Sequence, residues 1–210
     1  MKKFFVLMLA LLMALQLPAF AAMGISVYTD PDTGYQLPYP ELWNSIDRAS
    51  IDAMIEKLAS GELVIEGMNT DSLTNLKNMM HQLPIVVFQS PIGGDNFNIY
   101  YVDDSSLANS TIEQFLAESG ENVRNGLKST FVEFTPLDPG SLITAGENTY
   151  ARFSGEGPLQ GRLCQMHQLY LLKGERMYII TFTFFPGEGE NLPENLQHIL
   201  DQVTAGFVPA

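Results

Sequence analysis

The side chains best suited to chemistry are one cysteine and three histidines, and their spacing favours no catalytic or metal site. Cys164 and His167 lie three residues apart in an apolar run that predicts a β-strand. Because successive strand side chains point to opposite faces, the His167 imidazole cannot activate the Cys164 thiol. Neither His81 nor His198 completes the H-E-x-x-H spacing of a zinc site. We therefore expect a buried, unreactive thiol and no bound cofactor.

Acidic and aromatic residues offer two further candidate sites. Residues 30–34 (DPDTG) lack the third ligand and the closing glutamate of an EF-hand loop, so they predict a plain turn. We interpret the acidic residues at 103–104 and 188–190 as solvated loop charges. Tyr39 and Trp43 could form a ledge for a ligand, but packing against the core explains them better. The chain contains no G-x-S-x-G, P-loop or G-x-G-x-x-G motif.

The beginning of the chain has the regions of a secretory signal peptide. Lysines at 2–3 precede an apolar run at 4–15, and an A-x-A pattern follows. We expect cleavage between Ala21 and Ala22, which leaves residues 22–210 as a single domain. The 12-residue run is shorter than the roughly 20 residues of a membrane-spanning helix, so an uncut anchor is the weaker alternative. No cysteine lies near the cleavage position, so the sequence does not indicate a lipid anchor.

The net charge is strongly negative and limits the partners. The formal charge is −13, and loss of the two leader lysines leaves 9 basic residues against 24 acidic ones, or −15. Such a surface repels the phosphates of nucleic acids and anionic lipid headgroups. We therefore exclude nucleic acid as a partner and expect no stable membrane anchor after cleavage. A weak site for a divalent metal such as calcium or manganese stays open.

Hydrophobic periodicity predicts alternating short strands and helices in the first half of the chain. A helix is indicated by Ile51, Met54, Ile55 and Leu58, with Gly61 as its end. A second helix is expected at 71–82. The strands are expected at 24–29, 35–37, 84–90 and 97–102.

The second half predicts one helix, a run of strands and a closing helix. Ser110 and Glu113 have the spacing of a capping box at the start of the first helix. Ser110 also belongs to an N-glycosylation pattern, which the cap explains better. The closing helix is expected to have Asn191 as its cap, Pro193 in its first turn and Gly206 as its end. Strands are expected at 131–134, 142–145, 148–154, 161–172 and 177–185, with a hairpin turn at 173–176.

The two long strands define the expected fold class. We interpret both as apolar on both faces, since Leu169 adjoins Tyr170 and Ile179 adjoins Ile180. A sheet of this kind is covered on both faces. Together with the dispersed helices, this predicts an α+β fold, a three-layer α/β/α sandwich around a mostly antiparallel sheet.

Three segments, in order along the chain, resemble the PsbP/Mog1-like superfamily, including its DcrB-like bacterial envelope proteins. They are 34–40 (GYQLPYP) with Trp43, 98–102 (NIYYV) before the helix from Thr111, and 177–183 (MYIITFT). The resemblance implies an antiparallel sheet between helices and mostly non-enzymatic roles, such as photosystem assembly or small-GTPase binding. It supplies no catalytic residues. The stretch 51–83 departs from the family and is interpreted as a helical insertion.

These observations predict a secreted or cell-envelope protein, in a periplasm or at a cell surface, that acts by binding without catalysis. Its partner would be an unidentified protein or small ligand. One alternative is an extracytoplasmic hydrolase whose site is assembled from residues dispersed in the sequence. Another is an interaction module in which the insertion 51–83 docks a partner.

Overall fold

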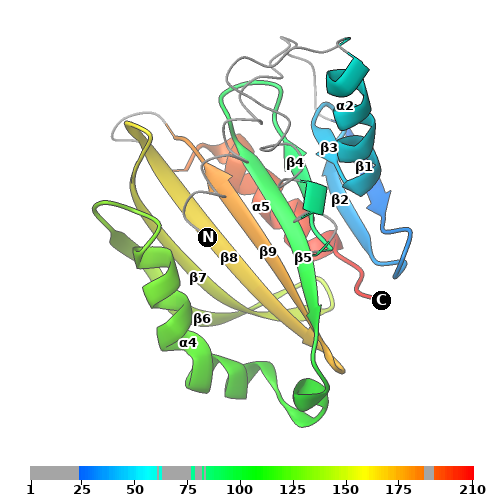
Figure 1. Ribbon diagram of the computed structural model, residues 1–210. Coiled ribbons are helices and arrows are strands. Elements are labelled where there is room, and N and C mark those ends of the chain that lie inside the picture. Colours follow the sequence, from blue (N-terminus) through cyan, green and yellow to red (C-terminus); the bar gives the residue numbers. More distant parts are fainter. Residues whose placement is uncertain (1–23, 61, 63–76, 79–81, 83, 187–191) are drawn as a thin grey trace.

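The computed structural model describes residues 24–60, 62, 77–78, 82, 84–186 and 192–210 (Figure 1). The expected signal peptide, with its cleavage position between Ala21 and Ala22, lies outside these residues. So do His81, Asn191 and most of the helix expected at 71–82. These expectations stay predictions.

The centre of the fold is a seven-stranded antiparallel sheet in the order β3-β4-β5-β9-β8-β7-β6. Short turns join β6 through β9 in succession, whereas the β5–β9 pair joins segments far apart in the sequence. The strands are β3 (Asn44–Ile46), β4 (Val86–Gln89), β5 (Asn96–Asp103), β6 (Thr135–Ala145), β7 (Asn148–Leu159), β8 (Arg162–Lys173) and β9 (Arg176–Phe184).

The remaining elements surround this sheet. A two-stranded hairpin contains β1 (Ile25–Thr29) and β2 (Gln36–Pro40). The helices are α2 (Arg48–Ser60), the short 3₁₀ helix η1 (Ser105–Asn109), α4 (Ile112–Lys128) and α5 (Glu194–Gly206). Within the described residues, no helix is both long enough and apolar enough to cross a membrane.

The larger core lies on the sheet face covered by α5 and the β1–β2 hairpin. Leu196, Ile199 and Val203 of α5 pack there against Tyr150 and Ile180 of the sheet. Trp43 is buried in the same cluster, and the Tyr39 ring lies 4.8 Å from that of Phe88. Packing of these two aromatic residues against the core is therefore confirmed.

The opposite face carries a smaller core beneath α4. Ile112 and Leu127 of α4 pack with Phe153 and Met166 of the sheet. Because Tyr150 and Ala151 are neighbours on β7 and belong to different clusters, the two helices cover opposite faces. In Figure 1, α4 lies along the β6–β8 side of the sheet and α5 runs behind it. The expected α+β sandwich around an antiparallel sheet is confirmed.

One strand expected from the sequence is absent. Residues 131–134 form no strand, and β6 begins at Thr135 instead. The apolar side chains there serve packing: Phe131 is buried in the smaller core and Phe134 lies against it. The two phenylalanines thus pack against the core as strand residues would, whereas Val132 is exposed and the backbone forms no strand.

The start of α4 differs by one residue from the expected capping box. The Thr111 hydroxyl accepts a hydrogen bond from the backbone N–H of Gln114. In return, the side-chain oxygen of Gln114 accepts one from the backbone N–H of Thr111. Ser110 instead ends η1, with its backbone N–H donating to Leu107 O. The short helix η1 ends where α4 begins, so the cap of α4 falls on the next hydroxyl residue.

The shifted cap predicts different effects for two neighbouring substitutions. Thr111→Ala should lower the free energy of unfolding by about 1 kcal/mol, because it removes a capping hydrogen bond. Ser110→Ala should change it by less than about 0.5 kcal/mol, because the side chain of Ser110 makes no cap. Urea denaturation of the two variants tests the assignment. A larger loss for Ser110→Ala would contradict it.

Candidate functional site

The sheet face on the α4 side divides into an apolar half and a polar half. Beneath α4, the side chains of β7 and β8 form the smaller core. Further across the same face, β4, β5, β9 and one position of β8 present amide and hydroxyl side chains. We call the following six residues the polar face: Gln89, Asn96, Asn98, Gln168, Thr181 and Thr183.

Strand register brings these six residues together in two rows. Asn96 lies opposite Gln89 on one side and Thr183 on the other. In the next row, Thr181 lies between Asn98 and Gln168. Directly opposed residues of antiparallel strands point to the same face. With strands about 4.8 Å apart and rows about 7 Å apart, the polar face, which runs from β4 to β8, spans roughly 14 Å by 7 Å.

Most of the polar face is removed from solvent. Asn96, Thr181 and Thr183 are only 3%, 4% and 1% exposed, and Asn98 is 5% exposed. Gln168 is half-buried at the border with the smaller core. Polar side chains this deeply buried are costly unless their hydrogen bonds are satisfied.

The hydrogen bonds within the described residues satisfy the polar face only in part. The Asn96 amide donates to Gly94 O over 3.0 Å. The Gln168 amide donates weakly to the Thr181 hydroxyl over 3.5 Å. The Thr183 hydroxyl is buried and has no partner among the described residues. Among the described residues, the Thr183 hydroxyl therefore keeps hydrogen-bonding capacity that is not used.

Two tyrosines and one carboxylate border the polar face. Tyr100 and Tyr170 are half-buried on the same face in the next row, and the Tyr170 hydroxyl donates to Gln168 Oε1 over 3.1 Å. At the other end, Asp95 Oδ1 accepts from the Phe185 amide over 2.8 Å. Burial raises the pKa of the Asp95 carboxyl above its usual range.

The polar face corrects the expectation that the two long strands are apolar on both sides. Their α5 side carries much of the larger core, including Leu169, Ile180 and Phe182. On the α4 side, β9 carries Thr181 and Thr183 instead. Helices thus lie on both faces of the sheet, with α4 over β6–β8, but the sheet is not apolar throughout.

The geometry of Cys164 and His167 agrees with the sequence prediction. Cys164 is fully buried in the smaller core beneath α4, whereas the His167 ring lies 6.2 Å from Phe184 of the larger core. Burial, with a smaller contribution from Asp95, raises the pKa of the thiol to about 12. A thiol with such a pKa is protonated at neutral pH and is a poor nucleophile.

The buried thiol predicts a slow labelling reaction. Cys164 should react with a maleimide far more slowly in the folded protein than in denaturant, because the reagent needs an accessible thiolate. Mass spectrometry of timed samples gives both rates. Rapid, stoichiometric labelling of the folded protein would contradict this environment and favour a reactive cysteine.

A second polar group lies on the α5 side, at the β6–β8 end of the sheet. Ser154 and His167 are directly opposed across β7 and β8, but no hydrogen bond between their side chains is present. Asp138 accepts from Arg152 Nε over 2.7 Å, so this carboxylate is already paired. Burial, with a smaller contribution from the positive charge of Arg152, lowers the pKa of His167 to about 4. The arrangement lacks the hydrogen-bonded Ser–His–Asp chain of a hydrolase.

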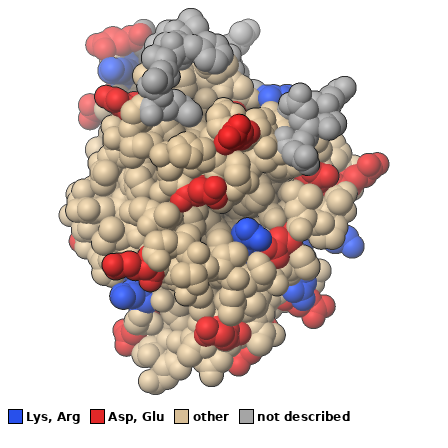
Figure 2. All heavy atoms as spheres, turned by 180° about the vertical axis from the view of Figure 1, so that it is seen from behind, with Lys and Arg blue, Asp and Glu red and all other residues tan. Residues whose placement is uncertain are grey.

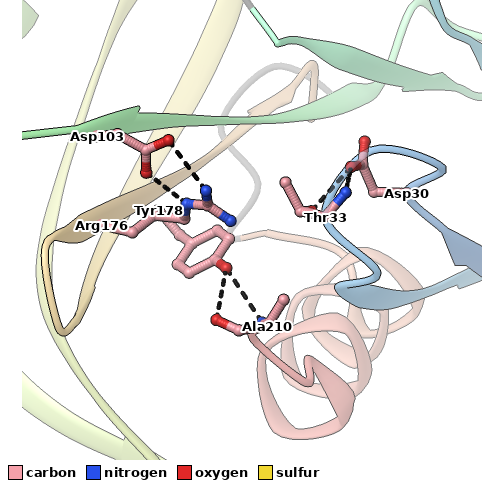
Figure 3. A network of polar contacts seen from close by, with 6 residues as sticks. All are labelled: Asp30, Thr33, Asp103, Arg176, Tyr178 and Ala210. Atoms are coloured by element: carbon pink, nitrogen blue, oxygen red, sulfur yellow. Dashed lines mark hydrogen bonds and ion pairs between the residues drawn. The ribbon is translucent and has the colours of Figure 1, made fainter.

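The acidic loop residues serve local structure (Figure 3). Asp103, expected to be a solvated charge, forms a two-point ion pair with Arg176, with N–O distances of 2.5 and 2.9 Å. Asp30 accepts from the backbone and hydroxyl of Thr33, which fixes the expected turn. The Tyr178 hydroxyl donates to Ala210 O over 3.1 Å. These bonds join β5 to β9, hold the turn of the first hairpin and join β9 to the last residue.

The two cavities and the surface charges indicate no particular ligand. A cavity of about 190 Å³ lies between Tyr28, Asp47 and Pro84, and one of about 330 Å³ lies between Thr111 and Lys173. Neither contains a buried polar group without a partner. In the described part of the chain, no three His, Cys, Asp or Glu side chains are grouped to hold a metal. Figure 2 shows acidic side chains scattered over the α5 side, without one continuous charged patch.

Comparisons with known proteins support the architecture and not a specific activity. No protein-family model and no curated protein sequence matches this chain. Solved structures match across most of it, at 11–17% sequence identity.

One of these structures is the solution structure of the cyanobacterial PsbP protein, CyanoP, from Synechocystis. It is 11% identical, with a TM-score of 0.53, over 93% of this chain and 98% of CyanoP. This chain therefore has the PsbP fold, as the sequence motifs indicated.

Two further structures match with lower TM-scores. A protein of Bacteroides thetaiotaomicron is 17% identical, with a TM-score of 0.47, over 84% of this chain, which spans only 45% of that protein. LpqN of Mycobacterium tuberculosis, described as involved in cell envelope biogenesis, is 13% identical, with a TM-score of 0.43, over 90% of this chain and 93% of LpqN.

Proposed function

We propose that this protein is an exported, non-catalytic binding protein and that the polar face is its ligand site. Export is supported by the signal-peptide pattern that ends at Ala21. Binding is supported by one observation above the others, the buried Thr183 hydroxyl without a partner among the described residues. A bound molecule that accepts or donates there would satisfy a group that is otherwise costly to bury.

The neighbouring groups favour binding over catalysis. The side chains of the polar face are neutral amides and hydroxyls, which orient a ligand by hydrogen bonds but do not transfer protons readily. The Cys164 thiol nearby is protonated at neutral pH because burial raises its pKa to about 12. His167, the nearest histidine in sequence, belongs to the opposite face of the sheet.

The side-chain amide signals in an NMR spectrum test the proposed site. Titration with a library of neutral polar fragments should shift the NH₂ signals of Asn96, Asn98 and Gln168. The NH₂ signals of Asn148 and Gln197 should stay in place, because these amides donate to Phe207 O and Asp201 elsewhere in the fold. If the shifts map to the latter pair, or no fragment shifts the polar face, the site is wrong.

A substrate panel separates this proposal from the hydrolase alternative. Ester, peptide and glycoside substrates should show no turnover above the uncatalysed rate. Turnover that is lost in Ser154→Ala or Cys164→Ser would establish the hydrolase instead. Turnover retained in both variants would also contradict the proposal and would place the hydrolase site at other residues, provided that the activity co-elutes with the purified protein.

A further inference from the structure

We infer that the ligand of the polar face is a neutral saccharide. This inference rests on the proposed function, because it names the chemical class of molecule that the same site would bind. The two rows of the polar face carry no ionisable side chain. Every residue in them is uncharged, from Gln89 at one edge to Gln168 at the other.

The absence of charge in the two rows excludes ionic ligands. A phosphate, carboxylate or ammonium group buried beside neutral amides would lose its hydration without gaining a counter-charge. The nearest carboxyl group is Asp95, and burial raises its pKa, so its environment disfavours charge. The guanidinium of Arg162 is directed to the Gly93 carbonyl, over 2.7 Å, and stacks on Phe185. Neither group supplies a free counter-charge for an ion.

The polarity of the two rows excludes purely apolar ligands. A lipid chain over Asn98 and Thr183 would leave both side chains buried without partners, at a cost of about 1–3 kcal/mol for each group. The ligand must therefore supply donors and acceptors together. A sugar hydroxyl is both at once, and two neighbouring hydroxyls match the donor and acceptor ends of one planar amide.

The border residues supply the second feature of such a site. Tyr100 follows Asn98 on the same face of β5, and Tyr170 follows Gln168 on the same face of β8. Both rings are half-buried, so they combine an apolar surface with a polar tip. The Tyr170 hydroxyl also holds Gln168 Oε1, which fixes the orientation of that amide for a partner.

Calorimetric titration of the purified protein tests the inference. The probes are neutral saccharides (methyl glycosides, N-acetylglucosamine and their disaccharides), a singly charged sugar phosphate, and an acetylated, amidated glycine peptide. At least one neutral saccharide should bind, and the corresponding sugar phosphate should bind at least tenfold more weakly.

Two matched variants place the binding on the polar face. Thr183→Val removes only the unpaired hydroxyl and should weaken saccharide binding about five- to tenfold. Thr204→Val is the control, since Thr204 is equally buried but already donates to Leu200 O on α5. It should leave the affinity unchanged.

The outcomes separate the inference from the proposed function. If the peptide binds in a Thr183-dependent way and no saccharide does, the saccharide inference is wrong and the binding site stands. If no probe binds, or binding is equally strong in Thr183→Val, both are wrong. Equal weakening by both variants would show an effect of stability and would also overturn the inference.

Discussion

Replacement of Gly157 by alanine should destabilise the protein by about 3 kcal/mol, which lowers the melting temperature by roughly 10 °C. Gly157 lies on β7, where its missing side chain lets residues 131–134 cross close to the sheet. A Cβ atom there would overlap the carbonyl oxygen of Glu133 and press on the Phe131 side chain at 2.9 Å. A backbone atom cannot move aside as the end of a flexible side chain can.

Gly126→Ala is the matched control for this prediction. Gly126 lies in the exposed interior of α4, and a Cβ atom there meets nothing within 4 Å. Alanine should therefore stabilise the protein by about 0.5–1 kcal/mol through helix propensity. Calorimetric unfolding of the two variants should give shifts of opposite sign. Equal shifts would show that residues 131–134 do not lie against β7 as described.

The second large effect is a loss of stability in acid caused by His167. Its pKa falls from 6.5 to about 4 on folding because its ring is buried, with the positive charge of Arg152 adding to the effect and Asp138 opposing it. Between these values the unfolded chain binds a proton that the folded protein does not. The free energy of unfolding should thus decrease as the pH falls from about 6.5 to about 4, by roughly 3 kcal/mol in total.

The variant His167→Gln should remove this contribution. Urea denaturation across the same pH range gives the decrease in the free energy of unfolding for each protein. In His167→Gln this decrease should be smaller than in the parent by roughly 2–3 kcal/mol. His198→Gln, at an exposed position on α5, is the control for the histidine-to-glutamine substitution itself. If the parent and His167→Gln show the same slope, His167 is not buried in its neutral form.

Local patterns predicted much of the fold. Apolar spacing indicated α2, α4 and α5, and the turn residues 173–176 indicated the β8–β9 hairpin. These elements depend on residues close in the sequence, so a single chain reveals them. The boundary errors also have local causes, such as the choice between Ser110 and Thr111 as the cap of α4.

The polar face was not predicted, although part of its signal was present. Residues 96–99 (NFNI) and 181–184 (TFTF) alternate polar and apolar side chains, which is the pattern of a strand with two different faces. Those two segments become neighbours only through the β5–β9 pairing, which joins positions far apart in the chain. No local pattern specifies that register. The interpretation of β9 as apolar on both faces came from Ile179 and Ile180 and overlooked the threonines that follow.

The free energy of unfolding of Thr183→Val, compared with that of Thr204→Val, tests the central claim most directly. If the Thr183 hydroxyl is unused in the free protein, valine should stabilise the protein or leave it unchanged, because it removes an unpaired buried polar group. Thr204→Val should lose about 1 kcal/mol, because its bond to Leu200 O is lost. A loss for Thr183→Val as large as that for Thr204→Val would show that the fold already uses this hydroxyl and that the polar face has no capacity left for a ligand.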